Sequence, residues 1–182
     1  MSKSAITKDQ LRSFIKRQKL FYSKEQLRKW SDDIRLTLLS NEFLKHSNTI
    51  LLYSSLRDEV DTCQLIEELA KEKQILLPVV DSDKLKLCVY NHHMIMGPYH
   101  IMEPQGPEYV DYDNIDLAIV PGTAFDKNKN RLGRGKGYYD KLLPLVKAKK
   151  IGICFGFQLV DKVPCEEHDI MMDFVITENG YQ

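Results

Sequence analysis

The sequence predicts a single α/β domain, residues 1–182, built on a mostly parallel sheet with helices on both faces. Two observations predict this class. Short runs that are apolar at almost every position, such as Leu117–Val120, indicate strands buried on both faces. These runs alternate with stretches whose apolar residues have helical spacing, which is typical of a parallel sheet covered by helices.

Two helices are expected to open the chain. Residues 7–10 (Thr-Lys-Asp-Gln) fit a capping box, and apolar residues follow at helical spacing. Residues 23–26 (Ser-Lys-Glu-Gln) repeat the signature before a second amphipathic stretch. We therefore divide the domain into a helical N-terminal part, residues 1–46, and an α/β body, residues 47–182.

Strand and helix signals alternate through the body. The strands are expected at 49–54, 74–80, 85–90, 117–120, 150–155 and 173–177, and the helices at 61–73 and 138–148. Because ligands of such folds sit at the carboxyl ends of the strands, the loops at 54–61, 122–137 and 156–169 should share one rim. The long segment 91–113, with its Gly-Pro and Glu-Pro pairs, is expected to form a wall or lid.

The loop before the 138–148 helix carries the strongest functional signal. Gly133, Gly135 and Gly137 alternate with Arg134 and Lys136. Glycines that take positive φ can turn backbone N–H groups inward, and the cations add charge to such an anion nest. The following helix places its positive end at the same point. The segment is neither a Walker A loop nor a dinucleotide fingerprint. We interpret it as a polyphosphate site, the alternative being a flexible turn with solvated charges.

The composition limits the classes of partner. Lys plus Arg and Asp plus Glu each number 26, so the formal net charge is zero. A neutral protein has no general attraction for nucleic acid or an anionic membrane, so the basic loop suits a small anion. We find no signal peptide, no membrane-spanning run and no zinc-like spacing of His and Cys, and we expect a cytoplasmic protein. The four cysteines, which form no Cys-x-x-Cys pair, are expected mostly as buried thiols: Cys63, Cys88, Cys154 and Cys165.

Several carboxylates could take part in chemistry, and the spacing leaves their roles open. Asp140 follows the loop and could hold Mg²⁺ or only favour the helix N-terminus. Asp169 and Asp173 are second candidates between which nothing in the spacing decides. Asp61 is expected to cap a helix, and Glu59 should project from the rim, toward a substrate N–H group or toward solvent.

No residue pattern indicates a protein nucleophile. The chain lacks a Gly-x-Ser-x-Gly elbow, and its cysteines have no activating basic neighbours. Catalysis should therefore rest on positioning and charge stabilisation, as in phosphoryl transfer.

Residues Pro121–Asp126 and Arg131–Asp140 together resemble the signature of the 5-formyltetrahydrofolate cyclo-ligase family, also called methenyltetrahydrofolate synthetases. Weaker similarities run in order along the chain, at Lys8–Arg12, Asp58–Thr62, Tyr99–Pro104 and Pro164–Asp173. The resemblance implies a Rossmann-like three-layer α/β sandwich behind the N-terminal helical pair. It also implies ATP-dependent cyclisation of 5-formyltetrahydrofolate to 5,10-methenyltetrahydrofolate, through a phosphorylated formyl group, with release of ADP and phosphate.

The alternative functions are a kinase or ligase acting on another small metabolite, and a nucleotide- or RNA-binding module. The zero net charge disfavours the latter. The resemblance implies ATP as the co-substrate, Mg²⁺ as the metal and small molecules as the partners. We expect a monomer, because nothing in the sequence demands a larger assembly.

The same resemblance assigns roles to individual residues. The nucleotide-binding residues are Lys8, Arg12, Arg131, Leu132, Gly133, Arg134, Gly135, Lys136, Gly137, Tyr138 and Tyr139, with Arg134 and Lys136 as catalytic cations. The substrate-binding residues are Ser54, Glu59, Tyr99, Arg134, Gly135, Lys136, Gly137 and Tyr138. Asp140 and Asp173 are assigned to Mg²⁺. Asn130 stands where the family often has glycine, and we expect it to keep the left-handed turn.

Overall fold

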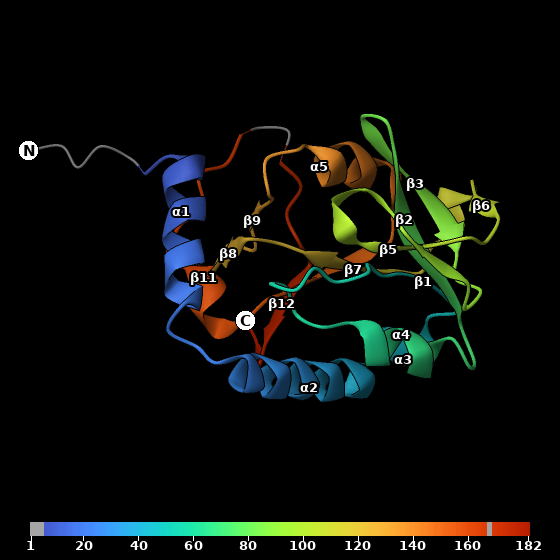
Figure 1. The fold of residues 1–182 in the computed structure, drawn as a ribbon, viewed down its shortest axis with the longest axis horizontal. Helices are drawn as coiled ribbons and strands as arrows, with labels where there is room; N and C mark the ends of the chain where they lie inside the picture. Colours follow the sequence, from blue (N-terminus) through green and yellow to red (C-terminus); the bar gives the residue numbers. More distant parts are fainter. Residues whose placement is uncertain (1–5, 167–168) are drawn as a thin grey trace, which may run out of the picture.

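The computed structural model describes residues 6–166 and 169–182 (Figure 1). The N-terminal helices are α1 (Lys8–Lys19), α2 (Lys24–Ser40) and the short α3 (Glu42–His46). Thr7 caps α1 with the complete capping box that the sequence predicts. Ser23 caps α2 by accepting a hydrogen bond from the backbone N–H of Gln26. The described part of the N-terminal segment is therefore helical from Lys8 to His46, apart from the short connections between the helices.

The centre of the molecule is an eight-stranded sheet within the described residues. Its strands are β1 (Thr49–Leu51), β2 (Gln74–Asp81), β3 (Lys84–Val89), β6 (Glu108–Tyr109), β7 (Leu117–Pro121), β10 (Lys149–Ile153), β12 (Phe174–Thr177) and β13 (Gly180–Tyr181). The strand order is β13-β12-β10-β7-β1-β2-β3-β6. The pairs from β12 to β2 are parallel, and the strands at both edges are antiparallel.

Helices cover both faces of the sheet, as the sequence predicts. On one face α2, α3 and α4 (Cys63–Leu69) pack on the strands through a cluster that contains Ile34, Leu44 and Leu65 (Figure 1). On the other face α5 (Tyr138–Leu142) and the 3-10 turn η3 (Leu143–Leu145) supply Leu142 and Leu143 to a second cluster. Every residue of β7 is buried, because this strand lies between the two clusters.

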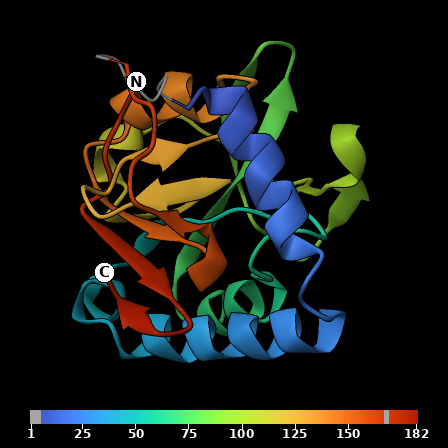
Figure 2. The same cartoon turned by 90° about the vertical axis from the view of Figure 1, so that its left-hand side faces the viewer.

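The first helix lies apart from these layers, at one end of the sheet (Figure 2). There α1 packs through Leu11 and Ile15 on a small three-stranded sheet. The strands of that sheet are β8 (Ala124–Asp126), β9 (Arg131–Leu132) and β11 (Leu159–Val160). The sequence analysis predicted loops at these positions, so this small sheet is a finding of the structure. It fixes the start of the glycine-rich loop against α1.

Several element boundaries differ from the prediction. The helix expected at 138–148 ends at Leu142, where Pro144, which has no backbone N–H, follows in a 3-10 turn. The helix expected from Asp61 begins at Cys63, with Thr62 in the capping position. Asp61 still satisfies the helix start, because its Oδ1 accepts a hydrogen bond from the N–H of Cys63 at 2.9 Å.

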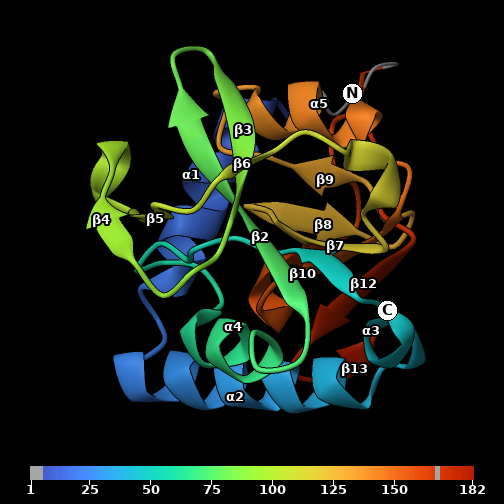
Figure 3. The ribbon, with the colours of Figure 1, turned by 90° about the vertical axis from the view of Figure 1, so that its right-hand side faces the viewer.

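In the segment 91–113, the antiparallel strands β4 (Met94–Met96) and β5 (Met102–Pro104), with the 3-10 turn η1 (Pro98–His100) between them, project as a flap (Figure 3). The segment then returns to the main sheet as the edge strand β6, which the 3-10 turn η2 (Tyr112–Asn114) follows. Tyr99 and His100 both take positive φ at the tip of the flap. Because side chains are strained in this region of φ, the tip holds its conformation against a local energetic cost.

No helix in the described part of the chain is long and apolar enough to cross a bilayer. All four cysteines are free, but only Cys88 and Cys154 are buried. The expectation that most of the thiols are buried is therefore wrong for Cys63 and Cys165, which are exposed.

Candidate functional site

A groove of about 340 Å³ opens at the carboxyl ends of the parallel strands. Its size is that of a site for a small molecule. Residues from all three loops that were expected to share a rim line it. Helix α1 and the flap also contribute residues to the lining. The lining includes Lys8, Arg12, Ser54, Glu59, Tyr99, Glu103, Gly122, Asp140, Asp169 and the whole of Arg131–Tyr139.

The glycine-rich loop differs in detail from the prediction. Gly135 and Gly137 take positive φ, at 95° and 71°, but Gly133 does not. Gly133 instead marks a close approach, since a Cβ there would lie 3.0 Å from Nη1 of Arg131, and the guanidinium would have to shift. The loop thus has two left-handed residues and one point of close approach, and it enters a helix of only five residues.

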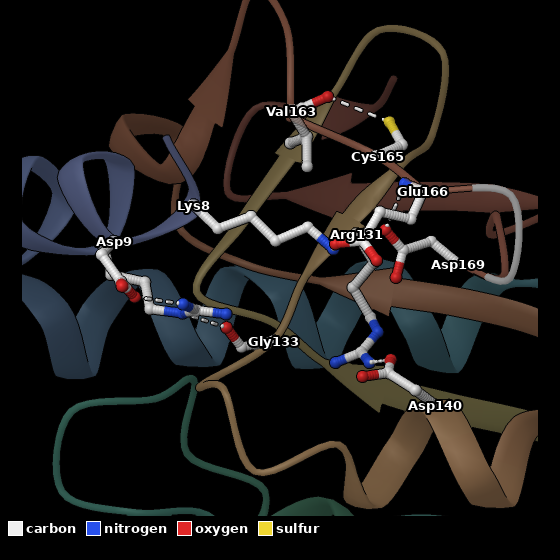
Figure 4. A network of polar contacts seen from close by, with 10 residues as sticks. Lys8, Asp9, Arg131, Gly133, Asp140, Val163, Cys165, Glu166 and Asp169 are labelled. Atoms are coloured by element: carbon white, nitrogen blue, oxygen red, sulfur yellow. Dashed lines mark hydrogen bonds and ion pairs between the residues drawn. The ribbon is translucent and has the colours of Figure 1, made fainter. Parts of the chain in front are cut away.

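The first helix brings two cations to the loop. The Nε of Arg12 donates a hydrogen bond to the carbonyl of Gly133 at 2.8 Å. One turn earlier, the Nζ of Lys8 lies 2.8 Å from Asp169 and 2.9 Å from Glu166, in the direction shown in Figure 4. Burial disfavours the charged Lys8, but hydrogen bonds to Asp169 and Glu166 outweigh it and raise the pKa of Lys8. Lys8 therefore stays charged beside the loop.

Arg131 serves the loop as a scaffold. Its guanidinium is buried, lies 5.4 Å from the centre of the Tyr139 ring, and donates to Oδ1 of Asp140 at 2.6 Å (Figure 4). A buried guanidinium held by a carboxylate and a ring has little freedom to follow a ligand. Arg131 therefore fixes the position of Asp140, and burial keeps Tyr139 neutral by raising its pKa.

The two cations inside the glycine run have different surroundings. Arg134 donates through Nε to Oε1 of Glu59 at 2.9 Å and also pairs with Asp58. Burial alone would lower the pKa of Arg134, but Glu59 and Asp58 raise it. Lys136, by contrast, is exposed at the groove and makes no ion pair within residues 6–166 and 169–182. The charge of Lys136 is thus available to a ligand, whereas that of Arg134 is largely balanced.

Glu59 is held firmly at the groove wall. Its side chain is only 11% exposed, and its second oxygen accepts a hydrogen bond from the backbone N–H of Leu56 at 2.9 Å. Each carboxylate oxygen has a further lone pair for a ligand N–H group. Of the two outcomes that the sequence left open, projection into solvent is therefore wrong.

Polar groups also gather beneath the flap. The hydroxyl of Tyr99 lies 3.1 Å from that of Tyr138, which links the flap to α5 across the groove. The hydroxyl oxygen of Ser54 is buried and has no hydrogen-bond partner among the described residues. A buried hydroxyl without a partner costs free energy, so a polar ligand group beside Ser54 would restore a lost hydrogen bond.

Glu103 is a groove residue that the sequence analysis missed. Its side chain lies on β5, the residue is 5% exposed, and Oε1 accepts a hydrogen bond from the backbone N–H of Val80 at 3.1 Å. Acidic side chains are almost never fully buried unless a partner group contacts them. The sequence signal was the position of Glu103 in a short strand at the end of the flap, which alone does not show that the side chain turns inward.

The structure does not bring Asp173, the second residue assigned to Mg²⁺, to this groove. Asp173 precedes β12 at the amino ends of the parallel strands, where it accepts hydrogen bonds from Nζ of Lys149 and the N–H of Lys150. The groove lies at the opposite ends of those strands. The carboxylate that lines the groove is Asp169, four residues earlier.

Two carboxylates at the groove could hold a metal ion, Asp140 and Asp169. No cluster of three or more His, Cys, Asp or Glu side chains suited to a metal occurs in the part of the chain that the structure describes. Asp140 and Asp169 nevertheless line the same groove beside the loop (Figure 4). Because Mg²⁺ is usually bound by one or two carboxylates together with substrate phosphates, these two residues fit it, and Asp140 with Asp173 do not.

The turn before the loop also differs from the prediction. Asn130 does not take positive φ; the left-handed residue is Lys129, with φ of 66°. The buried carboxylate of Asp126 holds this turn by accepting hydrogen bonds from the backbone N–H groups of Asn128 and Asn130 and from the Asn130 side chain. The expected turn exists, but its left-handed residue lies one position earlier.

Comparisons with known proteins agree with this arrangement. A model of the 5-formyltetrahydrofolate cyclo-ligase family matches residues 4–178. The 5-formyltetrahydrofolate cyclo-ligase of Mus musculus is 30% identical over 188 residues, covering 86% of this chain and 90% of the mouse protein. The Escherichia coli K12 cyclo-ligase is 33% identical over 142 residues, covering 72% and 78%. The NMR structure of Aquifex aeolicus 5,10-methenyltetrahydrofolate synthetase matches with a TM-score of 0.87 at 34% identity, covering 97% of this chain and 92% of that one.

Proposed function

This chain belongs to the 5-formyltetrahydrofolate cyclo-ligase family, and we infer from that membership that it catalyses the ATP-dependent cyclisation of 5-formyltetrahydrofolate. The products are 5,10-methenyltetrahydrofolate, ADP and phosphate. The site supports this function through one observation above all: the contact between Arg134 and Glu59 joins a phosphate-type loop to a carboxylate suited to a pterin.

The groove has two chemically different halves. One half is apolar, with Pro78, Val80, Leu85 and Ile101 on its walls, and suits the rings of a folate. Glu59 lies at the border, where its free lone pairs can accept the N–H groups of a pterin edge. The other half holds the cationic loop and α1, and suits a triphosphate.

We propose that the reaction passes through a phosphorylated formyl group. The oxygen of the formyl group on N5 attacks the γ-phosphorus of ATP. The bond between that phosphorus and the oxygen bridging it to the β-phosphate breaks, and ADP leaves. N10 then attacks the activated formyl carbon, the carbon–oxygen bond breaks, and phosphate departs with the former formyl oxygen. Loss of the N10 proton completes the 5,10-methenyl bridge. The nucleophile in each step belongs to a substrate, so no Ser or Cys nucleophile is needed.

The residues of this chain then act by position and charge. Lys136 neutralises the transferring phosphoryl group, because its ammonium is exposed and unpaired by the described residues. Lys8 and Arg12 hold the outer phosphates from α1. Arg134 fixes Glu59 and closes the gap between the two halves of the groove. Tyr99 and Tyr138, whose hydroxyl oxygens lie 3.1 Å apart across the groove, exclude water from the reacting groups.

We assign Mg²⁺ to Asp140 and Asp169 rather than to Asp140 and Asp173. The bound ion would neutralise charge on the phosphate oxygens and orient them. Arg131 contributes by holding the carboxylate of Asp140 at 2.6 Å, and Lys8 by holding that of Asp169. The cytoplasmic location and the monomeric state stay predictions.

The test is a spectrophotometric assay of the methenyl product with ATP, Mg²⁺ and 5-formyltetrahydrofolate, each omitted in turn. A signal that needs all three supports the function. Hydrolysis of ATP at the same rate without the folate would contradict it. Acid-quenched single-turnover experiments with γ-labelled ATP test the intermediate, since label must reach the folate before it reaches free phosphate.

A further inference from the structure

A second cavity, of about 330 Å³, lies beside the main groove. It shares Arg12, Gly122 and Arg134 with the groove, so these residues form the partition between the two. Its lining contains four cationic side chains and one carboxylate: Arg12, Lys16, Lys19, Arg134 and Asp58. The proposed reaction uses the partition but gives no role to the cavity behind it.

One face of α1 supplies most of this charge. Arg12, Lys16 and Lys19 follow at spacings of four and three residues, which places them on one side of a helix. Arg12 is already engaged with Gly133 and Asp9. Lys16 and Lys19 make no ion pair within the part of the chain that the structure describes. The helix therefore presents two ammonium groups to the cavity without a partner for either.

Lys19 is the residue that most strongly indicates an anion site. Its Nζ is buried, and the described residues offer it no hydrogen-bond partner. Burial lowers the pKa of Lys19, while Asp58 and Glu59 act in the opposite direction and Arg134 adds to the lowering. An ammonium that is removed from water and left without acceptors is costly, so native proteins rarely retain one without a counter-group.

The far wall of the cavity is rigid and uncharged. The side chain of Gln158 donates from Nε2 to the carbonyls of Gly122 and Thr123, at 3.0 Å each. Phe157 stacks on Phe155 at 5.7 Å between ring centres. A fixed wall opposite two ammonium groups makes a pocket in which an anionic group can be held without rearrangement.

We propose that this cavity binds an anionic oxygen group, a carboxylate or a phosphate, of a substrate whose reacting end lies in the main groove. Lys19 and Lys16 are the donors, and because the two spaces share Arg12, Gly122 and Arg134, a molecule in the groove lies next to the cavity. The inference rests on the proposed function and extends it. Two substrate groups have this chemistry: the glutamate carboxylates of the folate and the phosphates of the nucleotide.

The test compares Lys19→Met with Lys29→Met, an exposed lysine on α2 that serves as the matched control. Equilibrium titrations use ATP, 5-formyltetrahydrofolate and 5-formyltetrahydropteroate, which lacks the glutamate. If the carboxylates occupy the cavity, Lys19→Met weakens binding of 5-formyltetrahydrofolate by about tenfold or more and leaves the pteroate unchanged. If a phosphate occupies it, ATP binding weakens by a similar factor. Lys29→Met should change none of the three.

Two further readouts separate the outcomes. Lys19→Met should melt at the same or a higher temperature, because the substitution removes a buried charge without a partner, so a loss of affinity is not a folding defect. Binding of all three ligands within twofold of wild type would overturn the inference. Turnover by the wild-type protein is measured independently, so a failure of the cavity and a failure of the proposed reaction give different results.

Discussion

Exchanging Asp169 and Asp173 for Asn, one at a time, gives the sharpest test of the site. The two carboxylates lie four residues apart in sequence but at opposite ends of the parallel strands. Asp169→Asn should lower kcat/KM about 100-fold or more, the scale for removing one group that stabilises the transferring charge. Asp173→Asn should leave kcat/KM within about twofold, because its carboxylate contacts only β10 among the described residues.

The cost of Asp173→Asn should be one of stability. The carboxylate lies 2.9 Å from Nζ of Lys149 in a pair whose side chains are 32% and 53% exposed, so the ion pair contributes about 0.5 kcal/mol. Its other oxygen accepts the N–H of Lys150 at 2.8 Å, a hydrogen bond to a charged group that contributes about 1 kcal/mol more. We therefore expect a loss of about 1–2 kcal/mol in the free energy of unfolding, measured with urea at pH 7.

The pH dependence gives an internal check on Asp173. Burial acts to raise the pKa of Asp173, but hydrogen bonds from Lys149 and Lys150 outweigh it, and the pKa is lowered on folding. A carboxylate of this kind stabilises the fold above its unfolded pKa, about 4, and the contribution is lost as pH falls through the lower folded pKa. The difference in stability between wild type and Asp173→Asn should thus be full at pH 6 and shrink toward pH 2–3.

Magnesium titrations complete this test. Asp169→Asn should require a higher Mg²⁺ concentration for half-maximal rate, whereas Asp173→Asn should follow the wild-type curve. The reverse pattern, with activity lost in Asp173→Asn and kept in Asp169→Asn, would refute the placement of the metal at the carboxyl ends of the strands.

Three further substitutions examine the groove. Lys136→Ala should lower kcat by about 100- to 1,000-fold in the product assay, equivalent to about 3–4 kcal/mol. The control Lys127→Ala, at an exposed lysine of the preceding turn, should keep the wild-type rate, and a near-normal rate for Lys136→Ala would remove Lys136 from the mechanism. Glu103→Gln keeps an acceptor for the N–H of Val80 but loses charge, so the KM for folate should rise about tenfold with an unchanged melting curve; an unchanged KM would make Glu103 purely structural. In Gly135→Ala, the alanine must adopt φ near 95° and place its Cβ 3.3 Å from the guanidinium carbon of Arg12, so the KM for ATP should rise and the free energy of unfolding should fall by about 1–2 kcal/mol. Wild-type values for both would show that the loop does not need its left-handed residue.

The sequence could predict the elements that depend on local signals. The capping box at Thr7, the N-cap at Ser23 and the apolar strands are each encoded within a few neighbouring residues, and the structure contains them. The contact of Arg12 with Gly133 was not predicted: the family resemblance only assigned both residues to the nucleotide site, and residues 121 positions apart meet through the docking of α1. Local periodicity contains no information about such a contact.

The errors have the same physical origin. Asp169 and Asp173 both lie in the segment that leads into β12, and only the path of that segment decides which one faces the groove. The left-handed turn was placed at Asn130 because the family often has glycine at this position and asparagine tolerates positive φ nearly as well. The network around Asp126 overrides that preference and moves the left-handed conformation to Lys129. Glu103 was missed because its burial depends on the flap folding over β2.

The charge of the loop is divided between two tasks, and the sequence alone does not show the division. Arg134 and Lys136 stand two residues apart in the same glycine run. Arg134 is balanced by Asp58 and Glu59, whereas no carboxylate among the described residues balances Lys136. A balanced cation holds geometry, because moving it would expose two carboxylates; an unbalanced one can follow charge as it develops. Folate that engages Glu59 would act directly on the carboxylate that holds Arg134. The same contact that orients the pterin can therefore set the loop for phosphoryl transfer, which would make ATP cleavage depend on the presence of the folate.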